Sequence, residues 1–176
     1  MKKFDWRKGN NNWATSTYAG RCTFGGDANG PLQDAKFNFP ISAAQFNEKI
    51  IVFEQLGQAI REINVITGTV VTAFRSSFMF IGMALGEKGS EFYGTVNHGI
   101  LQIFDQKESW LVGSNSSGSR TGGFSSAEFN QPANIQWLTT SVLLVTDSKN
   151  NELKVINLKS EKVNTVCSGE FNKRKI

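Results

Sequence analysis

An internal repeat constrains the fold of this chain more than any other feature of its sequence. The segment Asp34–Pro40 (DAKFNFP) returns as Ser126–Pro132 (SAEFNQP). The matching residues Ala35 and Ala127 stand 92 residues apart (127 − 35), which corresponds to two periods of about 46 residues. We therefore expect a third, middle copy between the two clear ones.

Short runs of aliphatic and β-branched residues follow each copy and are separated by polar breaks. In the two clear copies these runs begin at 50–53 and 142–145 and close at 69–72 and 162–166. The middle copy lacks the Phe-Asn-x-Pro motif, but it keeps comparable runs at 92–93, 99–104 and 110–112. A period near 46 residues, with several short strands and turn signals in each, predicts one four-stranded β-propeller blade per repeat.

The repeat predicts an all-β chain, an incomplete β-propeller ring of about three blades plus one extra strand. The propeller is expected over residues 13–169, and its blades at about 33–74, 78–113 and 127–169. The segment 13–20 is similar to the closing strand of a further repeat and supplies the extra strand. Residues 1–12 and 170–176 are expected to be basic tails, and they carry much of the net charge of +4.

Glycine-rich and polar segments are predicted to connect these strands. The stretches 25–31 and 113–123 supply residues that adopt positive φ, as tight turns between blades require. Asp147–Asn151 is predicted to be a polar turn between two strands, and we favour this turn over a calcium site. The corresponding breaks are placed at Glu54–Gly57 and Gly94–Asn97.

These features resemble NHL repeats. The matching elements are a glycine-rich entry, the Ala-x-Phe-Asn-x-Pro segment, a strand ending in an acidic residue, and a Val-x-Thr closing strand. The junctions at Tyr18–Cys22 and Val166–Gly169 are similar to NHL arrays in large extracellular animal proteins. The resemblance implies a fold that is usually closed by six blades, and it slightly favours an extracellular location, although no signal peptide is evident at the N-terminus.

The resemblance also implies a function and an assembly. NHL propellers act mostly as platforms for protein partners, some members bind RNA, and a few relatives are lyases or hydrolases. A complete six-bladed ring needs roughly twice this length of chain. We therefore expect either a piece of a larger protein or a head-to-tail homodimer that completes one ring.

The sequence contains no pattern that indicates catalysis or a bound cofactor. His98 is the only histidine of the chain, so a site built from several histidines is excluded. It falls where a turn is predicted, and its spacing suggests neither a metal ligand nor a base beside a nucleophile. We expect a protein that is not an enzyme and carries no cofactor or metal. Cys22 and Cys167 are either free thiols or one long-range disulfide, and on a propeller such a bond would join two chains.

Candidate binding residues are arginines and tryptophans, the usual anchors of protein interfaces. They are Arg61, Trp110, Arg120 and Trp137, although strand tryptophans are more often part of a core. Basic and acidic residues alternate through 34–62, and no continuous basic face results. A protein partner is therefore favoured over nucleic acid, and no apolar run is long enough for a membrane span.

Overall fold

The computed structural model of the chain describes residues 2–4, 15–21 and 25–168. These residues form strands and turns, with no α-helix among them and one 3-10 helix, η1 (Ser148–Asn150). They divide into two compact units, Met1–Ser77 and Phe78–Ile176. No helix in the described part of the chain has the length and apolar character that crossing a membrane requires.

The first unit contains a small two-stranded sheet, described below, and a five-stranded sheet, here named the first blade. Its spatial order is β3-β7-β6-β5-β4, and each neighbouring pair is antiparallel. The strands are β3 (Gly30–Pro31), β4 (Pro40–Phe46), β5 (Lys49–Glu54), β6 (Ala59–Asn64) and β7 (Thr69–Arg75). Strands β4 to β7 thus form a simple meander, as the repeat predicts for a blade.

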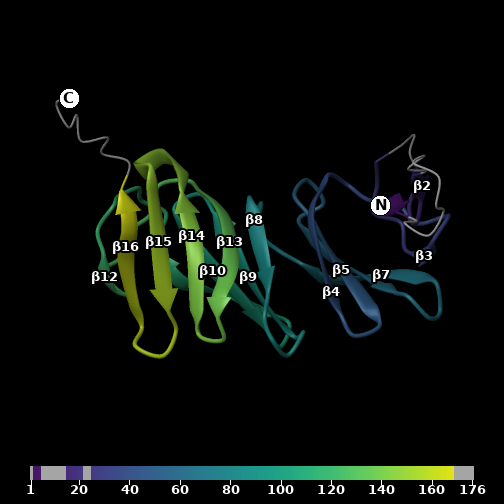
Figure 1. The fold of residues 1–176 in the computed structure, drawn as a ribbon. Coiled ribbons are helices and arrows are strands. Elements are labelled where there is room, and N and C mark those ends of the chain that lie inside the picture. The colour runs from purple at the N-terminus through teal and green to yellow at the C-terminus, as the bar shows by residue number, and fades with distance from the viewer. Residues whose placement is uncertain (1, 5–14, 22–24, 169–176) are drawn as a thin grey trace, which may run out of the picture. The chain divides into compact units, whose positions relative to one another are not determined.

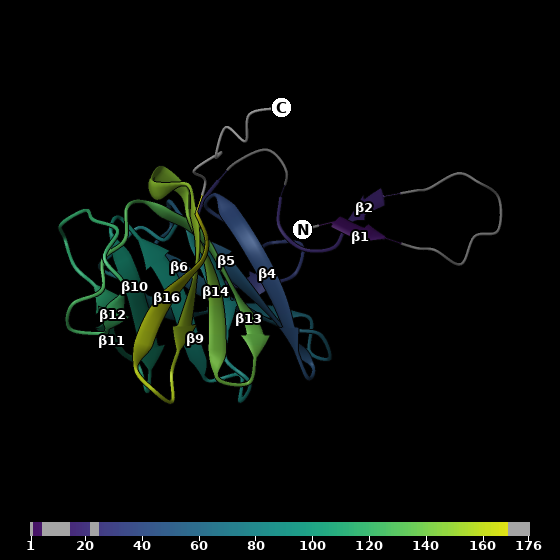
Figure 2. The same ribbon diagram turned by 60° about the vertical axis from the view of Figure 1, so that its left-hand side comes forward.

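The second unit contains two sheets, the middle blade and the last blade (Figures 1 and 2). The middle blade consists of β8 (Gly82–Leu85), β9 (Glu91–Val96), β10 (Gly99–Phe104) and β11 (Lys107–Gly113). The last blade consists of β12 (Gly122–Gly123), β13 (Pro132–Thr139), β14 (Val142–Asp147), β15 (Glu152–Asn157) and β16 (Lys162–Ser168). All strand pairs in both blades are antiparallel. The blades face each other, and β13 of one contacts β8 and β9 of the other.

The core of the second unit lies between these two blades. The alternation of side chains along a strand places every second residue on one face, and aliphatic and aromatic residues of this face form the core in both blades. The middle blade contributes Ala84, Tyr93, Ile100 and Val112. The last blade contributes Ile135, Leu143, Val145, Ile156 and Val163, together with Ala127 and Phe129 of the repeated motif. The Ala and Phe of the motif therefore pack between two blades in this copy.

The equivalent residues of the first blade form a smaller core in the first unit. Val52, Ile63 and Val70 are buried together with Ala35 of the motif. They pack against Ala19, with Phe37, Tyr18, Leu32 and Ile50 partly buried at the edge of the cluster. Within the first unit, the segment that holds Tyr18 and Ala19 covers part of this face.

The glycine-rich entries add a short strand to the outer edge of two blades. Gly30 pairs with Val70 of β7, and Gly122 pairs with Val163 of β16. Gly30 and Gly122 have φ of +137° and +132°, values that L side chains rarely adopt. The glycines at these two positions are therefore required by the backbone, in agreement with the predicted role of the entries.

Two sequence predictions about strand placement are corrected. Lys2–Phe4, within the predicted N-terminal tail, forms strand β1, which pairs with β2 (Thr15–Thr17). The extra strand near residue 15 therefore pairs with the N-terminal segment instead of closing a blade.

The second correction concerns the middle repeat. Gly94, Thr95 and Val96 belong to β9, and the break falls at Asn97–His98. The two-residue turn here replaces a four-residue turn at 55–58 in the first blade, so a fixed spacing from the other copies misplaced the break by a few residues.

Candidate functional site

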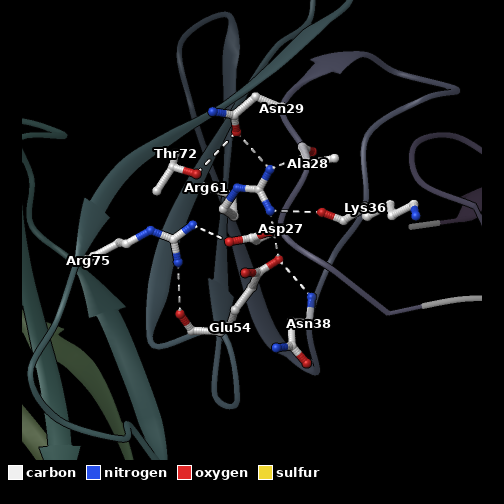
Figure 3. A network of polar contacts seen from close by, with 10 residues as sticks. Asp27, Ala28, Asn29, Lys36, Asn38, Glu54, Arg61, Thr72 and Arg75 are labelled. Atoms are coloured by element: carbon white, nitrogen blue, oxygen red, sulfur yellow. Dashed lines mark hydrogen bonds and ion pairs between the residues drawn. The ribbon is translucent and has the colours of Figure 1, made fainter.

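A buried ion pair lies where β5 ends in the first blade. The guanidinium Nη1 of Arg61 lies 3.1 Å from Oε1 of Glu54, and neither side chain is exposed to solvent. Arg61 also donates hydrogen bonds to the carbonyl oxygens of Lys36 and Ala28, at 2.8 Å and 3.0 Å. Oε1 of Glu54 accepts a hydrogen bond from the backbone N–H of Asn38 at 3.0 Å. As Figure 3 shows, the pair joins the glycine-rich entry and the repeated motif to the blade.

An outer group of polar contacts surrounds this pair. Asn29 Oδ1 accepts hydrogen bonds from Arg61 at 2.9 Å and from Thr72 at 3.1 Å. Arg75 forms a 2.6 Å ion pair with Asp27, in which both side chains are at least half exposed. The entry segment 27–29 is thus bound to strands β6 and β7 of its own blade (Figure 3).

The last blade repeats the inner arrangement with different residues. Nζ of Lys154 lies 2.8 Å from Oδ2 of Asp147, and both side chains are fully buried. Asp147 Oδ1 accepts a hydrogen bond from the backbone N–H of Asn130 at 2.7 Å. Lys154 donates to the carbonyl oxygens of Glu128 and Ser119 at 2.7 Å and 3.2 Å. Each cation also lies over the motif phenylalanine, Arg61 over Phe37 and Lys154 over Phe129.

The middle blade has apolar residues at the corresponding positions. Val96 ends β9 and pairs with Gly99, as Glu54 pairs with Ala59. Leu101 stands two residues after Gly99, as Arg61 stands two residues after Ala59. Val96 and Leu101 are buried. The blade without the Phe-Asn-x-Pro motif is therefore also the blade without the ion pair.

The electrostatics of Glu54 follow from its burial. Desolvation raises the pKa of its carboxyl above 4.5, and the Asn38 N–H and the Arg61 charge only partly oppose this effect. Its second oxygen, Oε2, is buried and has no hydrogen-bond partner. A Cβ at position 57 would collide with this oxygen, so Gly57 makes room for it. The group is enclosed on all sides, and we assign both ion pairs to holding the motif in place.

A pocket of about 260 Å³ opens on the face of the first blade. Phe37 of the motif, Val52 of β5 and residues 40–43 of β4 line it. The lining is apolar except for the hydroxyl of Ser42, and it contains no acid, base or cation. A pocket of this composition suits an apolar ligand or side chain and provides no proton-transfer partner for Ser42.

The four candidate binding residues occupy different environments. Arg61 is fully buried in its ion pair and does not reach the surface. Trp137 is half-buried in the second unit, where its indole N–H donates to the Leu85 carbonyl at 2.6 Å and its ring meets Tyr93 edge-on. Trp110 on β11 is 37% exposed and packs edge-on against Phe78. Arg120 is exposed and pairs with Glu128 at 3.4 Å.

The structure therefore does not gather the candidates into one site. Trp110 and Arg120 remain accessible, whereas Arg61 and Trp137 stabilise the blades. The buried acid and base pairs were missed because charged residues are ordinarily exposed. A signal was present in the sequence, since a basic residue stands seven positions after the aligned acid in both copies (61 − 54 and 154 − 147).

His98 lies in the predicted turn, at Asn97–His98. Its side chain is half-buried, and its Nδ1 atom is enclosed without a hydrogen-bond partner. Among the described residues, no three His, Cys, Asp or Glu side chains are grouped as metal ligands. Cys22 lies outside the described residues, and a bond between Cys22 and Cys167 therefore stays a prediction.

No family model and no curated protein matches this chain. Solved structures match at the level of the fold. An auxiliary nutrient binding protein from Bacteroides ovatus is 18% identical with a TM-score of 0.59, over 76% of this chain and 37% of that one. A corresponding protein from Bacteroides thetaiotaomicron is 13% identical with a TM-score of 0.57, over 76% of this chain and 36% of that one.

A virginiamycin B lyase from Staphylococcus aureus, solved with quinupristin, is 16% identical with a TM-score of 0.52, over 72% of this chain and 40% of that one. The chain thus spans less than half the length of each of these structures. The matched chains are β-propeller-like, and they agree with the three antiparallel blades seen here. Three blades are fewer than the four to eight of a closed propeller. The fold is an all-β partial propeller whose ring is not closed.

Proposed function

We propose that this chain is a non-catalytic interaction module, an NHL-type partial propeller that binds protein through the open face of its first blade. The observation that carries the proposal is the apolar pocket lined by Phe37, Val52 and residues 40–43. Buried apolar contact is the main source of affinity in protein interfaces. The NHL assignment is supported by the repeated motif, whose Ala, Phe and Asn have the same roles in the first and last blades.

The composition of the pocket favours binding over catalysis. Its single reactive group, the Ser42 hydroxyl, has no base among the lining residues. The buried acids Glu54 and Asp147 are held by backbone N–H groups and cations. Neither acid lines the pocket, so they have no part in chemistry there.

Affinity capture with three immobilised forms of the chain tests the proposal. The forms are wild type, Ala43→Glu and the control Ile66→Glu. Ala43 lines the pocket and is exposed, whereas Ile66 is 69% exposed in the turn between β6 and β7. Both variants add one negative charge to an exposed position, so the added charge is matched and its location differs.

We expect the wild-type and Ile66→Glu forms to retain the same specific proteins. The Ala43→Glu form should no longer retain them. The proposal fails if all three forms retain the same proteins, because binding would then not use the first blade. Circular dichroism of each variant confirms that the β structure is intact.

A second candidate is part of a larger propeller enzyme of the lyase type. The fold similarity to virginiamycin B lyase favours it over other enzymes. Quinupristin, the molecule named with that lyase, is the direct probe. Loss of quinupristin during incubation with the chain would replace the binding proposal with the enzymatic one.

A further inference from the structure

The contact between the middle and last blades is a template for a contact that the first blade lacks. In the second unit, the last blade buries Phe129, Ile135 and Val145 against the middle blade. The middle blade contributes Ala84 and Tyr93 to this contact. A blade of this chain therefore has one face that receives the preceding blade.

The receiving face of the first blade is built from the equivalent residues. Ala43 pairs with Val52 across β4 and β5, as Ile135 pairs with Val145 across β13 and β14. Phe37 corresponds to Phe129 of the motif. The segment with Tyr18 and Ala19 packs on part of this face, and the 260 Å³ pocket lies where covering residues such as Ala84 and Tyr93 would be expected. The pocket therefore occupies the position of a docking surface for a blade.

The last blade has an open face of the complementary kind. Leu144 is the third residue of β14, as Tyr93 is of β9. Leu153 is the second residue of β15, as Ile100 is of β10. Tyr93 and Ile100 of the middle blade are buried against the last blade. Leu153 is 37% exposed, and Leu144 and its cross-strand neighbour Val155 are half-buried. The last blade thus offers aliphatic residues where the middle blade offers its docking residues.

We propose that the last blade of one copy, through Leu144, Leu153 and Val155, docks on the pocket face of the first blade of a second copy. The proposal rests on the function given above and names its partner. A second copy is favoured because both halves of the contact are present in this chain and reproduce a blade pairing that the chain already makes. Such a head-to-tail contact closes into a ring when its rotation permits and otherwise continues as an open chain.

Analytical ultracentrifugation over a concentration range tests this contact. We expect wild type and Ile66→Glu to self-associate, and Ala43→Glu and Leu153→Glu each to weaken self-association by about tenfold or more, because a carboxylate would be buried without a partner. Both substituted residues are exposed at the surface. The folded state of each variant is checked by circular dichroism.

Mixing the two variants makes the test specific. A copy with Ala43→Glu retains an intact last blade, and a copy with Leu153→Glu retains an intact first blade. An equimolar mixture should therefore recover a heterodimer through one intact contact, although each variant alone associates weakly. General stickiness of an apolar surface would not produce this recovery.

The outcomes separate this inference from the proposed function. The self-docking proposal is overturned if wild type is monomeric at every concentration, or if the mixture does not recover association. In that case, capture of a different protein that depends on Ala43 would leave the proposed function standing. Self-association with full recovery, and no other protein captured, would support the contact and limit the function to assembly.

Discussion

The first and last blades differ from the middle blade in how they hold the loop that enters the blade. In the first and last blades a buried acid and base bind the backbone of the motif segment, through Asn38 and Lys36 in one and Asn130 and Glu128 in the other. The middle blade has Val96 and Leu101 at these positions and has no such motif.

The comparison teaches that the buried charges serve the backbone of the motif. A buried ion pair alone is often no more stabilising than packed apolar residues, because desolvation offsets the attraction. Here the pair also forms hydrogen bonds with one N–H and two carbonyl groups of the motif and the entry segment. A blade without the motif has no such groups to satisfy, and apolar residues suffice.

Removal of one member of the pair should have the largest effect. Arg61→Met leaves the Glu54 carboxylate without its counter-charge in a fully buried site and removes the hydrogen bonds to the Lys36 and Ala28 carbonyls and to Asn29, and we expect a loss of about 3–5 kcal/mol in the free energy of unfolding. Urea unfolding followed by circular dichroism measures this loss. Arg21→Met, which removes an exposed pair with Asp34, is the matched control and should change the free energy little. A similar loss in both variants would refute the structural role of Arg61.

Copying the middle blade into the first blade sharpens the comparison. The double variant Glu54→Val with Arg61→Leu buries no charge, but it removes the hydrogen bonds that the pair makes to the Asn38 N–H and to the Lys36 and Ala28 carbonyls. At about 1 kcal/mol for each lost hydrogen bond, we expect the free energy of unfolding to fall by about 3 kcal/mol. This is the lower end of the range expected for Arg61→Met. A double variant as stable as wild type would show that the motif does not need the pair.

The pH dependence of stability depends on the protonation of Glu54. Its pKa is raised in the folded state, so the folded protein binds the proton more tightly than the unfolded chain does. The contribution of Glu54 to stability is thus fully present below pH 4.5 and is lost as the pH rises through the raised value. The free-energy difference between wild type and Glu54→Gln, followed by urea unfolding from pH 4 to pH 8, should fall across this window. A difference that rises with pH would contradict the direction of the shift.

The smallest expected effect concerns the titration of Tyr93 in the middle blade, which is measured by spectroscopy. Burial and the neighbouring Glu91 raise the pKa of the Tyr93 phenol to about 12. Tyr18 and Tyr93 are the only tyrosines, so Tyr18→Phe isolates the signal of Tyr93. The ultraviolet titration of this variant should have a midpoint near 12 while the protein stays folded, and stability should fall as the pH rises from 10 toward 12. A midpoint near 10 would mean that Tyr93 is exposed to water.

Much of the fold could be predicted from the sequence because the repeat is strong in two copies. The predicted runs at 50–53 and 142–145 and the closing runs at 69–72 and 162–166 fall in β5, β14, β7 and β16. The strands β4 and β13, which come directly after the motif, were not predicted. The middle blade was harder to align because its Asn97–His98 turn is shorter, and a constant period assigned the end of β9 to the break.

The candidate site was predicted less well. Interface anchors were chosen by residue type, and this rule cannot distinguish Arg61, which is buried against Glu54, from the exposed Arg120. The pocket was not foreseen, because it depends on which face of β4 is left uncovered. A sequence pattern gives the alternation of faces but not the neighbour that each face meets.

The attachment of the glycine-rich entry to its own blade has a consequence for anyone who wishes to transplant a blade into another protein. Arg61 reaches back to Ala28 and Asn29, and Lys154 reaches back to Ser119, all of them upstream of the first long strand of their blade. A graft cut at Pro40 or Pro132 would leave these cations buried beside a severed segment. The smallest portable cassette therefore begins well before the sheet itself, near Gly25 in one copy and Gly118 in the other.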